Sequence, residues 1–162
     1  MLRHVFSGNR ALRRDFPRAT LAAIETAIAA AEARHAGEIR FAIEPALTPR
    51  QIRAGVTARA RALEVFSHLG VWDTEHNNGV LIYLLLADRA VEIVADRGVA
   101  GGRVQVGEWP AVARRMEQRF RAGDFRGGCV AGIEGVADVL ARHPPGVRKA
   151  GNELPDAPVI LR

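Results

Sequence analysis

The feature that most constrains the fold is an eight-residue apolar run, VLIYLLLA, from Val80 to Ala87. It is far shorter than the roughly 20 apolar residues that a membrane-spanning helix needs. Because its residues do not alternate between apolar and polar, it is typical of a central strand covered on both faces. Asp88 and Arg89 form a tight turn, and Ala90 to Ala95 returns as a second strand. Residues 79–95 therefore predict a β-hairpin inside a layered domain.

The residues around this hairpin predict further helices and one more strand. Glu38 to Glu44 alternates in polarity, as a half-buried strand does. Apolar residues at helical spacing predict a helix that Thr20 caps and Gly37 ends. A second helix runs from Thr48, which forms a capping box with Gln51, to Gly70. Behind the hairpin we expect a glycine-rich connector with a short edge strand at 103–106, a helix at 110–121, and a helix at 125–142 capped by Asp124.

The predicted order is α-β-α-β-β-α-α, which indicates a three-layer α/β/α sandwich with a small mixed sheet of three or four strands. The first strand, its crossover helix and the second strand form a βαβ unit, right-handed by the usual rule. The 162 residues favour one domain. We expect an Arg-rich N-terminal arm at 1–15, the domain at 16–145 and a C-terminal tail at 146–162. Apolar residues of the tail, Leu154 and Val159 to Leu161, favour its docking on the domain.

Charge and cysteine content narrow the function classes. The net charge is +5, but all 23 basic residues except Lys149 are arginines, dispersed along the chain. This dispersal disfavours nucleic-acid binding, which needs a basic stripe. The densest group lies in the arm and comprises Arg3, Arg10, Arg13, Arg14 and Arg18. Cys129 is the only cysteine, which excludes an intrachain disulfide and predicts a small core residue. Trp72 and Trp109 are expected to be packing anchors.

The sequence lacks the motifs of several kinds of chemistry. Gly98 to Gly102 lacks the Lys-Ser or Lys-Thr of a phosphate-binding loop, and no dinucleotide fingerprint is present, so we expect no nucleotide or redox cofactor. The sequence has no zinc-protease helix, no GxSxG elbow and no EF-hand loop. Met1 to Pro17 has no apolar core of a secretory signal, which predicts a cytoplasmic protein without a membrane segment.

The remaining candidate site is a group of oxygen-bearing side chains at strand ends. Asp73, Asn77 and Asn78 precede the second strand, and Asp96 follows the third. Since the paired strands are antiparallel, these four residues are expected to meet at one edge of the sheet. Carboxylate and amide oxygens are the ligands that calcium and magnesium take. Asn77 and Asn78 also fit plain turn chemistry, and Asp96 fits an ion pair with Arg97, so both interpretations stay open.

Four stretches together resemble a known family: GEIRFAIE (37–44), LGVWDTEHNNGVLIYLLLADRAVEIVADRGV (69–99), RFRAGDFRGGCVAGI (119–133) and NELPD (152–156). They are similar to the TPM-domain family, and specifically to its soluble, single-domain bacterial branch. The resemblance implies an α/β/α sandwich. Thylakoid relatives are described as acid phosphatases or photosystem-repair factors, and an animal relative as a receptor accessory. Some members bind calcium through acidic loops. Asp15 loosely matches an acidic residue that members often carry before the first helix.

Three functions follow from these observations. The first is a non-catalytic binding or accessory module, with a protein partner, that holds calcium or magnesium at Asp73, Asn77, Asn78 and Asp96. The second is a metal-assisted phosphatase in which Asp96 is a metal ligand and Arg97 binds the phosphate. The third is binding of an acidic partner through the arginines of the arm.

Overall fold

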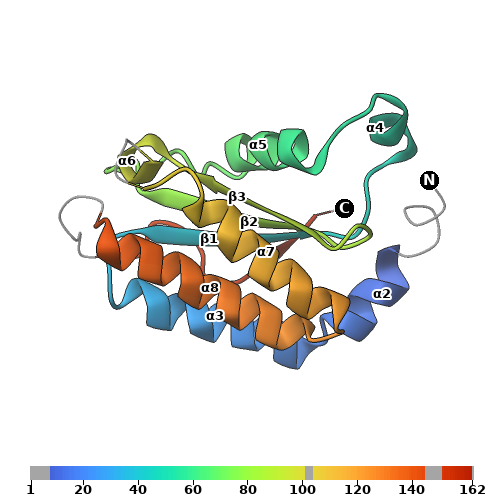
Figure 1. The fold of residues 1–162 in the computed structure, drawn as a ribbon, viewed down its shortest axis with the longest axis horizontal. Helices are drawn as coiled ribbons and strands as arrows, with labels where there is room; N and C mark the ends of the chain where they lie inside the picture. The colour runs from blue at the N-terminus through green and yellow to red at the C-terminus, as the bar shows by residue number, and fades with distance from the viewer. Residues whose placement is uncertain (1–7, 101–103, 145–150, 162) are drawn as a thin grey trace.

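A computed structural model describes residues 8–100, 104–144 and 151–161 (Figure 1). Pairs of helices mostly separate the strands along the chain. Their bounds are α2 Gly8–Asp15, α3 Arg18–Glu32, β1 Glu38–Glu44, α4 Pro49–Arg53, α5 Ala58–His68, β2 Gly79–Leu85, β3 Ala90–Ala95, α6 Arg97–Ala100, α7 Glu108–Arg121, α8 Phe125–Arg142 and β4 Val159–Ile160.

The described strands form a mixed sheet in the order β3-β2-β1-β4. β1 pairs parallel with β2, β2 pairs antiparallel with β3, and β4 adds in parallel to the other side of β1. Helices α3, α7 and α8 cover one face and α5 covers the other (Figure 1). The α/β/α sandwich expected from the sequence is therefore confirmed.

The sheet separates two apolar clusters, because successive side chains of a strand point to opposite faces. Ile39, Val80 and Ile82 contribute to the larger cluster beneath α3, α7 and α8. Leu81 and Tyr83 contribute to the smaller one beneath α5. Every residue of β2 is buried, which confirms the central strand predicted from the unbroken apolar run.

The helix expected from Thr48 to Gly70 is two helices, α4 and α5. The capping box between Thr48 and Gln51 is present, but Gly55 adopts a left-handed φ of 70° and ends the helical path. Thr57 then caps α5 by accepting a hydrogen bond from the Ala60 amide. After the break, Leu63 of α5 lies at the surface, where it is 48% exposed.

The N-terminal arm is more structured than the sequence suggested. Residues 10–15 lie within α2, and α3 begins before Thr20, with Pro17 in the N-cap position. Thr20 therefore lies in the first turn of α3 instead of capping it. Arg3 and the rest of 1–7 lie outside the described residues, and the binding of an acidic partner by the arm stays a prediction.

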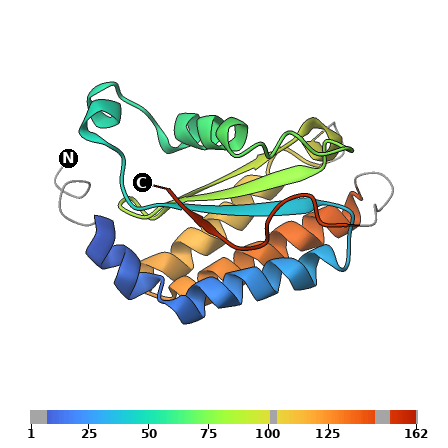
Figure 2. The same ribbon diagram turned by 180° about the vertical axis from the view of Figure 1, so that it is seen from behind.

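The edge strand expected at 103–106 is wrong, since 104–106 form no strand and Arg103 lies outside the described residues. The chain instead obtains its fourth strand from the C-terminal end. Residues 151–161, here called the C-terminal strap, run beside β1 and place β4 against it (Figure 2). Leu154 is buried in the smaller cluster, and the Leu161 amide donates to the Ile43 carbonyl. The strap is thus docked along the sheet edge.

The packing of α8 agrees with the sequence. Asp124 caps it by accepting from the Gly127 amide at 2.9 Å, and Cys129 is fully buried, which raises the pKa of its thiol. Trp109 packs against the larger cluster as expected. Trp72 does not, because it is 52% exposed and donates its indole N–H to the Ser67 carbonyl. None of the helices in the described residues is long and apolar enough to span a bilayer.

Candidate functional site

The edge of the sheet predicted from the hairpin does bring the loop before β2 against the end of β3. The Asp96 amide donates to the Gly79 carbonyl at 2.9 Å, and the Gly98 amide donates to the Asn77 carbonyl at 2.9 Å. Arg97 Nε donates to Asn77 Oδ1 at 3.2 Å. The structure therefore places Asn77, Asp96 and Arg97 together, as the antiparallel pairing predicts.

The oxygens at this edge are only partly available to a cation. Asn77 Oδ1 accepts from Arg97, and Asp96 Oδ1 accepts from the Arg97 amide at 2.7 Å. Asp96 Oδ2 is buried and has no hydrogen-bond partner in the described part of the chain. The exposed Asp73 side chain makes no hydrogen bond or ion pair with any described residue, so nothing draws it toward the other three.

Asn78 points to the other face of the sheet. The Asn78 Nδ2 donates to the Ala36 carbonyl. Because side chains alternate along a strand, Asn78 lies on the same face of the sheet as Val80, which is the α3 face. Asp96 lies on the same face as Val94, which is the α5 face. In the described chain, no group of three or more His, Cys, Asp or Glu side chains is arranged to hold a metal ion. The four predicted ligands thus divide into Asn77 with Asp96, Asn78 alone, and Asp73 alone.

Asn78 lines a hollow that the sequence did not predict. It lies between the end of α3, the start of β1 and the C-terminal strap, with a volume of about 260 Å³. Four carboxylates line it, and they define what we call the acidic hollow: Glu32, Glu38, Glu153 and Asp156. Of the residues that line it, none is an arginine or lysine, and His35 is the one basic side chain.

Hydrogen bonds from backbone amides and from one side-chain amide hold three of these carboxylates in place. Glu32 Oε1 accepts from the Ile39 amide at 2.6 Å, which joins α3 to β1. Glu38 Oε2 accepts from the Glu153 and Leu154 amides at 3.2 and 3.1 Å, which joins β1 to the strap. Asn152 Nδ2 donates to Asp156 Oδ1 at 2.6 Å. The hollow therefore exists only when the strap is docked.

The electrostatics of the acidic hollow are unfavourable without a proton or a cation. Burial raises the pKa of Glu32 to about 8, and the negative charges of Glu38 and Asp156 add to the effect. Burial also raises the pKa of Glu38. At neutral pH the Glu32 carboxyl is therefore largely protonated, and a bound cation would favour its ionised form.

A buried oxygen adds to the carboxylates. Asn78 is only 3% exposed, and its Oδ1 has no hydrogen-bond partner among the described residues. Because Nδ2 is held by the Ala36 carbonyl, Oδ1 cannot exchange places with it without bringing two oxygens together. A buried, unpartnered amide oxygen beside carboxylates is the donor set of a hard cation.

The polar side chains at the other end of β1 have a structural role. Glu44 is buried at the opposite end of β1, where it accepts from the Tyr83 hydroxyl at 2.5 Å and from Arg61 Nε at 2.9 Å. Burial, followed by the contact with Glu44, raises the pKa of the Tyr83 hydroxyl. Since each of these groups has its partners, the trio stabilises the fold and leaves no group for chemistry.

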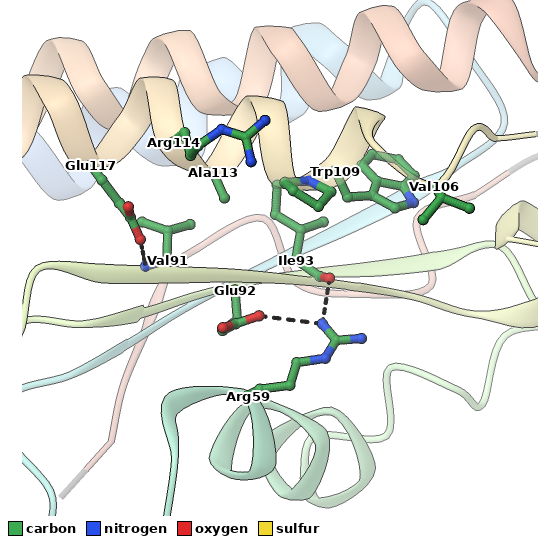
Figure 3. Close-up of a pocket in the computed structure, with 10 residues that line it drawn as sticks. Arg59, Val91, Glu92, Ile93, Val106, Trp109, Ala113, Arg114 and Glu117 are labelled. Atoms are coloured by element: carbon green, nitrogen blue, oxygen red, sulfur yellow. Dashed lines mark hydrogen bonds and ion pairs between the residues drawn. The ribbon is translucent and has the colours of Figure 1, made fainter.

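A hollow of about 420 Å³ runs along β3, the edge strand of the sheet (Figure 3). Glu117 of α7 accepts from the Val91 amide at 3.0 Å, and Arg59 of α5 donates to the Ile93 carbonyl at 2.9 Å. Glu117 and Arg59 thus form hydrogen bonds with an amide and a carbonyl group of β3 that could otherwise pair with another strand. The arrangement is a means of protecting an edge strand from aggregation.

The fold and the acidic hollow together define a small α/β/α domain with its candidate site at the amino-terminal end of the parallel strands. The TPM domain model matches residues 15–139, and the chain belongs to the TPM-domain family. Glu153 and Asp156 lie beyond the matched residues. A comparison with curated protein sequences gives no significant match.

Two solved structures are similar. One is the BA42 protein of the psychrophilic bacterium Bizionia argentinensis, determined by NMR, at 30% identity and a TM-score of 0.74 over 88% of this chain and 92% of that one. The other is the N-terminal domain of a protein from P. gingivalis, at 22% identity and a TM-score of 0.65 over 83% of each chain. The second likeness supports the fold alone.

Neither the strap nor Glu32 was part of the predicted site. The NELPD segment (152–156) contributes to the family resemblance, and its two acids and one amide within five residues are also the sequence signal that could have indicated a cation site. Their meeting with Glu32 depends on a contact between residues more than a hundred positions apart, which local patterning does not reveal.

Proposed function

We propose that this protein is a non-catalytic binding module that takes a divalent cation in the acidic hollow. The observation that carries the proposal is the gathering of Glu32, Asp156 and the buried, unpartnered Asn78 Oδ1 around one hollow in the described chain, where burial raises the pKa of Glu32. Glu32, Asp156 and Asn78 Oδ1 would hold the ion, which would replace the proton on Glu32. The cytoplasm is the proposed location and a protein the proposed partner; one buried cysteine fits a reducing compartment.

Calcium fits this hollow better than magnesium. The described carboxylates are not arranged as a ready coordination shell. Calcium accepts six to eight oxygens in irregular geometry, whereas magnesium demands a near-ideal octahedron. Because Glu32 must lose its proton, calcium binding should strengthen as the pH rises through about 8.

The test is the melting temperature with chelator and then with millimolar calcium or magnesium. Calcium at about 100 times its dissociation constant adds about 2.7 kcal/mol, or about 5–10 °C for a chain of this size. We expect this shift to disappear in Glu32→Gln and Asp156→Asn. The matched control is Glu25→Gln, on the exposed face of the same helix, which should keep the full shift.

Two outcomes contradict the proposal. If no divalent ion raises the melting temperature of the wild-type protein, the acidic hollow is not a cation site. If the shift survives in Glu32→Gln and is lost in Asp96→Asn, the ion binds at the edge with Asn77, as the sequence alone suggested.

A second candidate function, a metal-assisted phosphatase, is favoured by Asp96 and Arg97. Asp96 Oδ2 is buried without a partner, and the exposed terminal amino groups of Arg97 have no acceptor among the described residues. A carboxylate that orients water and a guanidinium that binds phosphate would suit phosphoryl transfer. Hydrolysis of 4-nitrophenyl phosphate that is lost in Asp96→Asn and kept in Glu25→Gln would establish it. Equal activity in both variants would indicate a contaminating enzyme.

A further inference from the structure

The hollow along β3, here called the edge groove, is also where the sheet can accept another strand. In an antiparallel pair, every second residue directs its backbone groups away from the neighbouring strand. The Asp96 amide bonds to the Gly79 carbonyl of β2, so Val91, Ile93 and Ala95 are the residues of β3 that face away from β2. Val91 and Ile93 line the edge groove, and their amides and carbonyls are therefore directed toward it.

Side chains bind two of these four backbone groups and leave two. Glu117 accepts from the Val91 amide, and Arg59 donates to the Ile93 carbonyl. The Val91 carbonyl and the Ile93 amide have no hydrogen-bond partner among the described residues. In a parallel pair, one residue of the added strand donates to a carbonyl and accepts from the amide two positions later. The two remaining groups are thus the pair that a single residue of a parallel strand requires.

An antiparallel strand fits this edge less well. Its residue opposite Val91 would direct a carbonyl at the amide that Glu117 holds, and its residue opposite Ile93 would direct an amide at the carbonyl that Arg59 holds. Two copies of this chain that pair through β3 about a twofold axis would be antiparallel, and would bring both sets of side chains into the same space. The hydrogen-bond pattern therefore favours a short parallel segment of a different protein.

One end of the edge groove is apolar. Figure 3 shows Trp109 and Val106 near the Ile93 end of β3, Glu117 at the other end, and Arg114 between them on α7. Val106 is 97% exposed, which is unusual for an aliphatic side chain beside a tryptophan. These two side chains offer an apolar contact to one residue of an incoming segment.

The charge of the edge groove is left uncompensated at Arg114. This exposed arginine has no hydrogen-bond or ion-pair partner in the part of the chain that the structure describes. Glu117 lies one turn further along α7 but pairs with Arg121 at 3.4 Å, and Glu92 pairs with Arg59 at 3.5 Å. Since both carboxylates that line the groove are engaged, an acidic side chain of a partner would complement Arg114.

We propose that β3 binds a short extended segment of a partner protein, parallel to β3, with an acidic residue and an apolar residue two positions later. Side chains two positions apart share one face of a strand, so both would point toward α7. The acid would then meet Arg114, and the apolar side chain would meet Trp109 and Val106. Glu117 and Arg59 limit the pairing to two backbone hydrogen bonds, which admits a short segment and excludes long strands.

The test is titration of the purified full chain with the peptide acetyl-Thr-Asp-Thr-Ile-Thr-amide, followed by amide NMR shifts with chelator present. A contact this small is weak, so the peptide is added to about 5 mM. We expect the Ile93 amide to shift. Methylation of the amide nitrogen of the central threonine removes the donor to the Val91 carbonyl and should weaken binding about tenfold. Arg114→Gln should weaken binding about fivefold, and should not change the binding of a peptide with asparagine in place of aspartate.

The matched control is Arg115→Gln, an exposed arginine on the same helix but outside the edge groove, which should bind the peptide as tightly as the wild-type protein. The proposal is overturned if the Ile93 amide does not shift, if the methylated peptide binds equally well, or if the Arg114 and Arg115 variants weaken binding equally. A shift of the Ile93 amide on dilution without peptide would assign the edge to a second copy and would also overturn it. No residue of the acidic hollow is involved, so either outcome leaves the cation proposal to its own test.

Discussion

Replacing Glu32 by glutamine should remove a pH-dependent loss of stability. The amide keeps the shape of the protonated carboxyl group, and its oxygen can still accept from the Ile39 amide. In the folded protein the pKa of Glu32 is raised to about 8 from a usual value of 4.5. The folded state therefore binds more protons than the unfolded state between these values, and the free energy of unfolding falls as the pH rises through this window.

The size of the effect follows from the same two values. A difference from 4.5 to about 8 corresponds to about 5 kcal/mol at roughly 1.36 kcal/mol per pH unit. Solvent screening of this partly exposed carboxyl group reduces the figure to about 2 kcal/mol. Glutamine in place of Glu32 should thus match the wild-type protein near pH 4.5 and exceed its stability by about 2 kcal/mol above pH 8. For this chain length that is about 4–8 °C in melting temperature.

The assay is urea unfolding at pH 5, 6.5 and 8.5 in the presence of chelator, for the wild-type protein, Glu32→Gln and Glu25→Gln. Because groups away from the acidic hollow titrate equally in all three proteins, the difference between variants reports on Glu32 and on its interaction with Glu38 and Asp156. Glu25 is exposed on the same helix, so its variant should follow the wild-type curve. A constant difference between Glu32→Gln and the wild-type protein across this pH range would refute the reasoning.

Three further predictions concern the rest of the fold. Glu44→Gln weakens a buried pair with an arginine of α5 and should cost about 2–4 kcal/mol in urea unfolding at pH 7; a cost below about 0.5 kcal/mol would contradict the assigned role. Gly79→Ala should prevent accumulation of soluble protein, because the added Cβ would overlap a backbone carbonyl oxygen of the preceding loop; a variant that unfolds cooperatively with wild-type stability would contradict the packing. Glu117→Ala should promote self-association, seen by light scattering, because the Val91 amide on the sheet edge loses its partner; a strictly monomeric variant would show that the edge needs no protection.

Part of the candidate site could be predicted from sequence because it depends on local pairing. An antiparallel hairpin brings the residue before one strand beside the residue after the other, and this places Asn77 against Asp96. The prediction for Asn78 was incomplete because adjacent residues of a strand face opposite sides of the sheet. Asn78 therefore belongs to the α3 side, where Glu32 lies, and not to the side of Asp96.

The sequence by itself determined the elements whose signals are local: the unbroken apolar run of β2, the tight turn after it, and the caps at Thr48 and Asp124. Tertiary structure decided where distant segments meet. The strap reaches β1 because that strand has a free edge, and because the buried Glu38 carboxylate accepts two strap amides. Those contacts bring Asp156 to Glu32, and the burial and repulsion of their carboxyl groups exist only in the folded chain.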